Sequence, residues 1–518
     1  MNRGPQYVTS RSRAWRVPRA VVVVFAAGVV LRVLFLLLSA NNGGDALDRV
    51  GKTEEWLEYP SLQLFFGPWM PMHFWMMGGL GALLGNVEWA GRLLSLAMGA
   101  GSMWLAWRIA QREYGDYAAL LSLCAMAFYT LHIGYSTTTS SEMPYLFFSL
   151  AGLDFLLQYK RDARVESLVW SGLLFGTGAA IRYEAWVLIT GAVIILAVLP
   201  WQSVRNLRLA APLPHLVIFV VTAGAWPAFW MVLTYSQFGD PLYFLTMQHV
   251  WVPIINRDAG ITPELKLVSS TVLLVLSLSL PVVLAAVYGI WRAIREPEGR
   301  AIVALYICFA AVQLYQIVTE GMWPAPRFTI TQGALLAILA GHGLHRWAGR
   351  LAPRWRPSRV AVVLSVVLLL NLAAVLAFSE MRQPYSDTIS NISPRLRFPH
   401  YVHDVGDFLR ARYAAGEPLV IDNHNFQSVF VAVAAGLPVR PGEEVFLKQF
   451  RRLDELQPFL QQRRPRYLVY SAQGKLREIL PLPEDCSTSR VREIEFRCVY
   501  SNEIYSVFEL NHGQVSPE

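Results

Sequence analysis

Apolar runs of about 20 residues recur along this chain and constrain its fold more than any other feature. The first is "RAVVVVFAAGVVLRVLFLLLSA", residues 19–40, and similar runs follow up to residue 378. A helix needs about 20 mostly apolar residues to cross a bilayer. Of the 518 residues, 54% are hydrophobic and only 16% are charged. The sequence therefore predicts a polytopic membrane protein, and its first run is too long for a cleavable signal peptide.

The positive charge of the chain is arranged for membrane topology rather than for nucleic-acid binding. The net charge is +8, but basic residues gather in the segments between apolar runs, so we expect no nucleic acid as a partner. The positive-inside rule places such clusters in the cytoplasm. They are the N-terminal tail 1–19; Arg108 and Arg112; Lys160, Arg161 and Arg164; Arg205 and Arg208; Arg292, Arg295 and Arg300; and Arg346, Arg350, Arg354, Arg356 and Arg359.

This charge pattern also decides one ambiguous segment, "FFGPWMPMHFWMMGGLGALLG", residues 65–85. If it crossed the bilayer, most later basic clusters would fall on the wrong side. We therefore expect an interfacial or re-entrant helix, with Trp69, His73 and Trp75 near the headgroups. The remaining segments predict eleven spans: 20–40, 90–110, 117–134, 142–159, 166–181, 184–200, 213–235, 267–291, 301–318, 328–346 and 359–378.

Eleven spans divide the chain into a cytoplasmic tail (1–19), a membrane domain (20–379) with a first external loop at 41–89, and an exported domain (380–518). The exported domain alternates strand-like stretches such as "PLVIDN" and "PRYLVYS" with helical ones, which predicts a soluble α/β fold. Cys486 and Cys498 lie in this domain, where a disulfide is chemically permitted. His424 follows a predicted strand and is read as a structural polar residue.

Acids at the ends of spans are candidates for chemistry, because charge near lipid is costly unless it is paired or faces water. Asp45 follows the first span and the flexible pair Gly43 and Gly44. It could be a base at the membrane surface or simply the N-cap of a helix. Glu142 precedes Pro144 at a span start, where the helix dipole alone would favour an acid.

Two arginines stand out among the external segments. Arg182 lies in the tight hairpin "IRYEAW", and Arg327 lies between prolines in "EGMWPAPRFTI". Arginine binds phosphate in a bidentate manner, although snorkelling to lipid headgroups is the alternative. A carboxylate base combined with such cations suits transfer from a lipid-phosphate donor.

The order of these parts resembles the GT-C superfamily of membrane glycosyltransferases, especially protein O-mannosyltransferases and the lipid A aminoarabinose transferase. The resemblance covers about residues 20–350. It rests, in chain order, on "GGDALDRV", "GPWMPMHFWMMGGLGALLG", "EWAGRLLSLAMGAGSMWLAWRIAQREYG", "SSEMPYLFF", "GLLFGTGAAIRYEAW" and "PAPRFTI". It implies a mainly α helical bundle with an exported α/β domain, located in a bacterial cytoplasmic membrane.

The resemblance also implies roles for individual residues. Asp45 would be the catalytic base of a glycosyltransferase that uses a polyprenyl-phosphate-linked sugar, usually with inversion, outside the cytoplasm. The acceptor would be a hydroxyl of a protein, lipid or glycan, and membrane lipids are further partners. Candidate substrate-binding residues are Asp48, Glu142, Arg182, His249, Arg257 and Arg327.

The chain departs from the family at two positions. Ala46 stands where many relatives have the second acid of an Asp-Glu pair, so that acid is missing or is replaced by Asp48. Met70 stands where some relatives have lysine before the proline of the interfacial helix. These differences leave the donor sugar and the acceptor undetermined.

Other functions are compatible with the composition. A transporter or lipid flippase also needs many spans, but transporters commonly show inverted repeats and charges in mid-membrane, and we find no repeat here. Another lipid-phosphate-dependent ligase would share the donor. No cofactor is firmly implied, and a divalent metal held by Asp45, Asp48 or Glu142 remains an open alternative.

Overall fold

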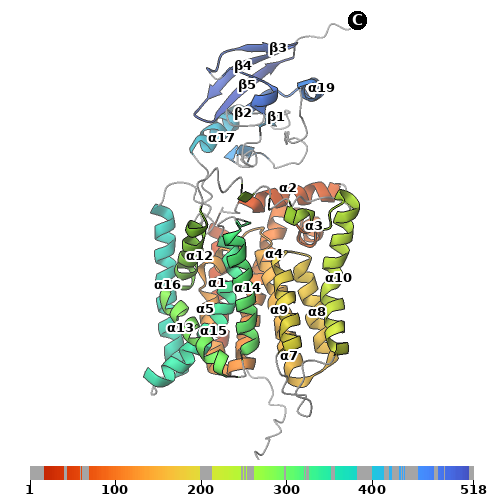
Figure 1. Ribbon diagram of the computed structural model, residues 1–518. Coiled ribbons are helices and arrows are strands. Elements are labelled where there is room, and N and C mark those ends of the chain that lie inside the picture. The colour runs from red at the N-terminus through yellow and green to blue at the C-terminus, as the bar shows by residue number, and fades with distance from the viewer. Residues whose placement is uncertain are drawn as a thin grey trace, which may run out of the picture.

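The computed structural model describes most of the membrane domain and much of the C-terminal domain. The described residues are 17–39, 44–58, 69–198, 213–246, 262–296, 299–319, 326–351, 356–381, 400–413, 419–422, 453–471, 476–483 and 485–512, with a few single positions between them. Figure 1 shows a bundle of helices, with the C-terminal domain above one end of it.

The bundle consists of helices, most of them apolar. In chain order they are α1 (Arg19–Leu38), α2 (Gly44–Glu58), α3 (Met72–Leu84), α4 (Val87–Tyr114), α5 (Asp116–Ala127), α6 (Thr130–Tyr135), α7 (Glu142–Asp162), α8 (Val165–Ala179), α9 (Glu184–Val198), α10 (Leu213–Phe238), α12 (Pro263–Leu278), α13 (Leu280–Arg295), α14 (Arg300–Val318), the short 3-10 helix η1 (Pro326–Thr329), α15 (Ile330–Leu351) and α16 (Pro357–Met381).

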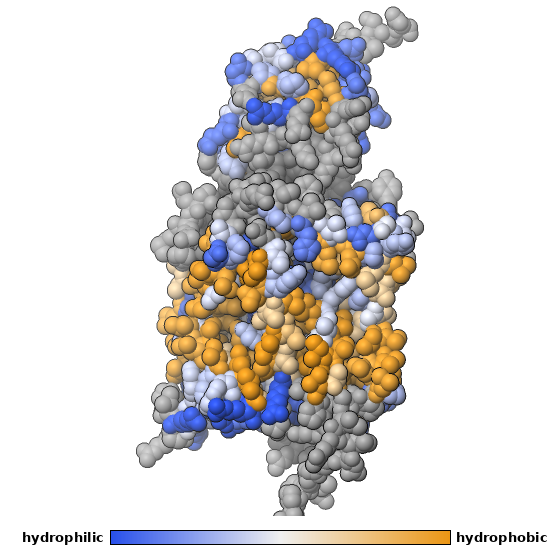
Figure 2. Space-filling model, in the orientation of Figure 1, coloured by the Kyte–Doolittle hydropathy of each residue, from blue (hydrophilic) through white to orange (hydrophobic). Residues whose placement is uncertain are grey.

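An apolar belt crosses the face of the bundle that Figure 2 shows. Figure 2 shows hydrophobic side chains across its middle and hydrophilic ones at its lower end and above. Among the described residues, α1, α4, α10, α14 and α16 are each long and apolar enough to cross a bilayer. Every span predicted from the sequence coincides with one or two helices of the bundle. The prediction of a polytopic helical bundle is therefore confirmed, whereas the number of eleven spans remains a prediction.

Two predicted spans are each divided in the structure. The segment 267–291 forms α12 and α13, which are bent by 104° relative to each other. Ser279 between them has a φ of 74°, in the left-handed region, and Pro281 follows in the first turn of α13. Proline is tolerated in a first turn, where its missing N–H needs no partner. The segment 117–134 forms α5 and α6, with Phe128 and Tyr129 between them.

Helices α2 and α3 lie at the end of the bundle nearest the C-terminal domain (Figure 1). Helix α3 has 13 residues, which is too short to cross a bilayer, as expected for an interfacial segment. The two helices pack closely: a Cβ built on Gly78 would come within 2.8 Å of the Trp56 ring. A glycine is therefore needed at this contact.

Charged side chains tie the helices together at the opposite end. Asp154 on α7 pairs with Arg108 at 3.0 Å and with Arg112 at 3.3 Å. Glu113 on α4 pairs with Lys160 at 3.4 Å and accepts a hydrogen bond from the Gly299 backbone at 3.1 Å. These contacts use the basic clusters that the sequence analysis assigned to the cytoplasmic side.

Arg32 is a fully buried cation within α1. Its guanidinium donates to the carbonyl oxygens of Ala127 at 2.9 Å and Met126 at 3.1 Å, and it contacts His132 Nδ1 at 2.7 Å. The last carbonyls of a helix lack intrahelical partners. Arg32 therefore supplies hydrogen-bond donors to the carbonyl oxygens at the C-terminal end of α5, inside the bundle.

The C-terminal domain has an α/β fold, as predicted. Its described elements are α17 (His400–Arg412), β1 (Leu419–Ile421), α19 (Leu453–Arg463), β2 (Tyr467–Ser471), α20 (Leu476–Ile479), β3 (Ser489–Val491), β4 (Ile494–Ser501) and β5 (Tyr505–Asn511). The strand order is β1-β2-β5-β4-β3; β1 and β2 are parallel and the other pairs are antiparallel. A disulfide joins Cys486 and Cys498, the pairing considered from the sequence.

Replacing Arg32 by leucine tests the buried cation. Arg32→Leu removes the donors to Met126 and Ala127, and we expect a loss of roughly 3 kcal/mol of stability, because buried carbonyls are left unpaired. Thermal unfolding in detergent measures the loss. Arg359→Leu, at an exposed position of α16, is the matched control and should change stability little; an equal loss in both variants would contradict the assignment.

Cysteine labelling tests the topology. Asn86→Cys, between α3 and α4, should react with a membrane-impermeant thiol reagent from the side that carries the C-terminal domain. Arg164→Cys, between α7 and α8, should react only from the other side. If position 86 reacts only from the cytoplasmic side, α3 spans the membrane and its interfacial assignment is wrong.

Candidate functional site

Helix α2 carries the acid that the sequence analysis placed first. Its buried face consists of Ala46, Arg49, Val50 and Thr53, and this face packs toward α3. Asp45 is the second residue of α2, one helical turn before Arg49, and Asp48 directly precedes Arg49. Residues four apart lie on the same side of a helix. The side chains of Asp45 and Asp48 lie outside the described residues.

A buried polar segment, 136–141, lies between α6 and α7 and runs beside α2. All six residues are serine or threonine, and all are buried. Thr139 Oγ1 donates to the carbonyl oxygen of Ala46 at 2.8 Å. Arg92 Nε donates to the Thr137 carbonyl at 2.8 Å, while its Nη2 donates to the Ser39 carbonyl at 2.6 Å.

These contacts bracket the position of Asp45. The carbonyl of Ser39, before it, is held by Arg92, and the carbonyl of Ala46, after it, is held by Thr139. A Cβ on Gly91 would come within 2.8 Å of Thr139, so α4 approaches the same segment closely. The backbone that carries Asp45 is therefore attached at both sides to one buried scaffold.

Arg182 and Glu142 meet directly. Arg182 Nη1 donates to Glu142 Oε1 at 2.6 Å and to Ser141 Oγ at 3.1 Å, and Arg182 Nε donates to Glu184 Oε1 at 3.0 Å. Burial alone would lower the pKa of the guanidinium, but the carboxylates of Glu184 and Glu142 raise it above its ordinary value. Arg182 is thus permanently charged and already engaged by two carboxylates.

An aromatic cluster extends the Arg182 hairpin toward the segment that follows α10. The rings of Tyr183 and Phe244 stack with centroids 3.7 Å apart, and Trp230 Nε1 donates to Tyr183 Oη at 3.2 Å. His249, which follows this cluster in the sequence, is exposed. It lies beside Gly321, because a Cβ built on Gly321 would be 3.4 Å from the imidazole of His249. Arg257 lies outside the described residues, as does His424.

Arg327 lies in η1 and is half-buried. Just after it, the Thr331 hydroxyl donates to Tyr145 Oη at 3.1 Å, and Tyr145 belongs to the first turn of α7, beside Glu142. The Thr329 carbonyl accepts from Tyr129 Oη at 3.4 Å. The structure therefore anchors the Arg327 segment to the same helix end that carries Glu142.

His73, which the sequence analysis placed near the headgroups, has a fully buried side chain. Neither ring nitrogen has a hydrogen-bond partner among the described residues. Burial, followed by the positive charges of Arg49 and Arg182, holds its pKa well below the usual 6.5. A lone polar residue within the apolar run "MPMHFWMMGG" was the signal that could have marked it.

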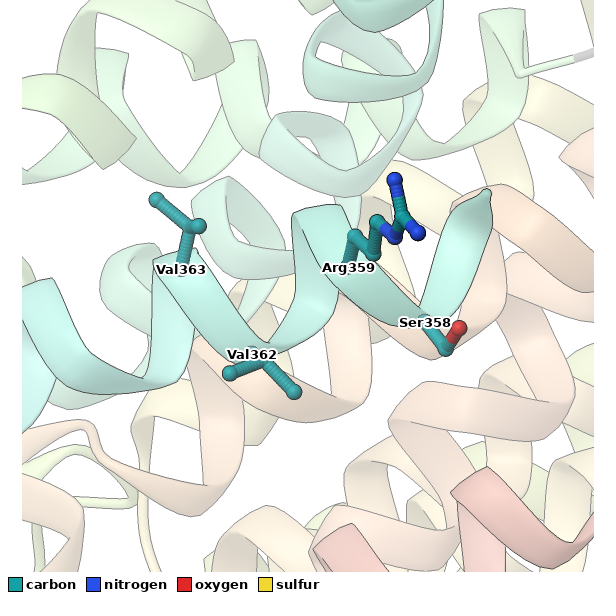
Figure 3. A pocket seen from close by; sticks show the side chains of 4 residues that line it. All are labelled: Ser358, Arg359, Val362 and Val363. Carbon is teal, nitrogen blue, oxygen red and sulfur yellow. The ribbon is translucent and has the colours of Figure 1, made fainter. Parts of the chain in front are cut away.

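Among the described residues, no group of three or more His, Cys, Asp or Glu side chains could hold a metal ion. Because the side chains of Asp45 and Asp48 are outside the described residues, the alternative of a metal at Asp45, Asp48 and Glu142 stays a prediction. A hollow of about 430 Å³ lies far from this region, at the start of α16. Figure 3 shows Ser358, Arg359, Val362 and Val363 around it.

Known proteins resemble this chain in part of its sequence and in its fold. Residues 67–230 match the family described as dolichyl-phosphate-mannose-protein mannosyltransferase. No curated protein sequence matches. The structure of ArnT from Cupriavidus metallidurans bound to undecaprenyl phosphate is 15% identical, with a TM-score of 0.59, over 96% of this chain and 99% of that one. The structure of the same ArnT in the apo state is also 15% identical, with a TM-score of 0.60, over 96% of this chain and 99% of that one.

A more distant similarity is to the Archaeoglobus fulgidus oligosaccharyltransferase in complex with Zn and sulfate. It is 10% identical, over 90% of this chain and 71% of that one, with a TM-score of 0.50. Together these similarities confirm the GT-C fold predicted from the sequence, including its C-terminal α/β domain.

The pH dependence of stability tests the environment of His73. The folded-state pKa is lowered, so below about pH 6.5 the unfolded chain binds a proton that the folded chain does not. Stability should fall with decreasing pH by up to about 1.4 kcal/mol per unit. Unfolding of the wild type and of His73→Leu, compared between pH 8 and pH 5, isolates this contribution. Parallel profiles would contradict a buried neutral imidazole.

Proposed function

We propose that this chain, which has the fold of the GT-C glycosyltransferases, transfers a sugar from a polyprenyl-phosphate-linked donor to an acceptor hydroxyl. Transfer would occur at the end of the bundle that carries α2 and the C-terminal domain. The observation that carries the proposal is the placement of Asp45. Its backbone is bracketed by the Arg92–Ser39 and Thr139–Ala46 contacts, on the same buried segment that leads into the Glu142–Arg182 pair.

In the proposed reaction, Asp45 acts as the general base. Its carboxylate accepts the proton of the acceptor hydroxyl while the hydroxyl oxygen bonds to the anomeric carbon of the sugar. The bond between that carbon and the phosphate oxygen breaks, and the polyprenyl phosphate leaves with its electron pair. A single displacement of this kind inverts the anomeric centre. A positioned base typically contributes a factor of about 10² to 10⁴ to the rate.

Cations near the base would stabilise the leaving phosphate. Arg49 is buried one turn after Asp45, and Arg327 is held by η1 next to the start of α7. Arg182 can join them only by sharing its guanidinium with Glu142 and Glu184. Asp48, His249 and Arg257 remain candidates for further contacts with donor or acceptor.

The donor class is supported by the ArnT structure, which contains undecaprenyl phosphate, and by the family match over residues 67–230. The acceptor would be a protein, a lipid or a glycan. The basic clusters at the opposite end of the bundle support a reaction on the outer face of the membrane, which we propose is a bacterial cytoplasmic membrane.

The transporter alternative has one structural observation in its favour, the bend of 104° between α12 and α13. Broken helices often line the central binding site of transporters. The paired acids and arginine described above lie at one end of the bundle instead, as a transferase acting at the membrane surface requires. A transporter would move the lipid-linked sugar across vesicles without cleaving it.

Replacing Asp45 tests the proposed base. Asp45→Asn keeps the size of the side chain but cannot accept the proton, so transfer from a radiolabelled polyprenyl-phosphate sugar should fall at least about 100-fold. The assay uses purified full-length protein, with and without EDTA to detect a divalent metal.

Glu55→Gln, on the same helix α2 and half-buried, is the matched control and should keep wild-type activity. Both variants must insert and purify like the wild type. Undiminished transfer by Asp45→Asn would remove Asp45 from the role of base, and lipid translocation without sugar release would favour the transporter.

A further inference from the structure

His73 occupies a position where an unpaired polar group is costly. Its side chain is fully buried, and both Nδ1 and Nε2 lack hydrogen-bond partners among the described residues. Buried polar groups in folded proteins are nearly always paired, and replacing one by an apolar group usually stabilises the fold. Because none of the described residues pairs with His73, we look for its partner in a bound ligand.

The surroundings of His73 place it in the candidate site. Met72 precedes His73, and its backbone N–H donates to the carbonyl oxygen of Ala180 at 3.2 Å. Ala180 lies two residues before Arg182, so this hydrogen bond attaches the start of α3 to the Arg182 hairpin. On the other side, the Phe74 ring lies 6.0 Å from the His73 ring and 5.4 Å from the guanidinium of Arg49. His73 thus lies where α2, α3 and the Arg182 hairpin meet.

The charge of His73 follows from these neighbours. Burial lowers its pKa, and Arg49 and Arg182 lower it further. The imidazole is therefore neutral at pH 7, with one nitrogen as a donor and the other as an acceptor. The lowered pKa makes the ring a weak base, and a neutral ring supplies no positive charge.

The hydrogen-bonding capacity of a neutral imidazole selects among ligands. A phosphate that carries two negative charges offers only acceptors, so it could pair with the N–H and would leave the other nitrogen unsatisfied. A hydroxyl both donates and accepts. Hydroxyls of a sugar can therefore satisfy both nitrogens of His73, while the neighbouring arginines are better matched to phosphate.

We propose that His73 contacts the sugar of the lipid-linked donor and helps to select it. One ring nitrogen donates to a sugar oxygen, and the other accepts from a sugar hydroxyl. This inference rests on the proposed function, because it assigns a sugar donor to the same site. It concerns recognition of the sugar and makes no use of the identity of the base.

The variant His73→Leu separates recognition from folding. Leucine fills a similar volume without polar atoms, so the variant should be at least as stable as the wild type. Gln313→Leu is the matched control: Gln313 on α14 is also buried, and both of its amide atoms lack partners among the described residues. His73→Gln keeps one donor and one acceptor and should retain part of the function.

Thermal shifts of purified full-length protein in detergent measure the binding, because a ligand that binds the folded state raises the melting temperature. The probes are undecaprenyl phosphate alone and undecaprenyl phosphate linked to mannose, glucose, galactose or aminoarabinose. The sugar-linked lipid that stabilises the wild type most is then titrated against each variant. We expect His73→Leu to bind undecaprenyl phosphate normally and the sugar-linked lipid at least tenfold more weakly.

Two results would overturn the inference. One is that His73→Leu binds the sugar-linked lipid as the wild type and Gln313→Leu do. The other is an equal loss of affinity for undecaprenyl phosphate without sugar, which would make His73 a phosphate contact. Since only binding is measured, a wild type that binds the sugar-linked lipid and transfers nothing would count against the proposed function and leave the role of His73 intact.

Discussion

Arg92 and Arg182 engage the buried Ser/Thr segment 136–141 from its two ends, and the rest of the candidate site depends on this arrangement. Arg92 connects Thr137 to the end of α1, and Arg182 connects Ser141 and Glu142 to the hairpin before α9. Arg92 is buried and Arg182 is partly buried, and each is paired with carbonyl or carboxylate oxygens. Removing one partner of such a pair leaves an uncompensated charge, which is far more costly than the pair is favourable. The segment therefore has one strongly preferred position. It positions α2 in turn, because Thr139 donates a hydrogen bond to the carbonyl oxygen of Ala46.

The helices could be predicted from the sequence because hydropathy along the chain reports lipid exposure and helix length directly. The predicted span 20–40, for example, differs by only one or two residues at each end from α1. The bend after Leu278 could not be predicted in this way. The apolar pattern continues through it, and the proline that follows is compatible with a helix start. What defines the break is the left-handed conformation of Ser279, which depends on packing between helices.

The sequence predicted which residues lie at the end of the bundle that forms the candidate site, but it did not predict which of their side chains contact one another. Topology alone placed Glu142 and Arg182 at the same end of the bundle, because each lies between spans on the external side. Their pairing, and the second carboxylate from Glu184, required the three-dimensional structure. His73 was expected near the headgroups because of its aromatic neighbours; its isolation within an apolar run marked it as unusual but did not show that protein covers it.

The two carboxylates on Arg182 have a consequence for turnover. A phosphate group that approached this guanidinium would compete with Glu142 and Glu184 for the same N–H donors. In the proposed reaction this competition would weaken binding of donor and of lipid-phosphate product alike, but it would matter most after transfer, when the product must leave before another donor can enter. An unopposed arginine would hold the spent lipid carrier longer. In that reaction the acids would favour product release without taking part in the bond that is made or broken.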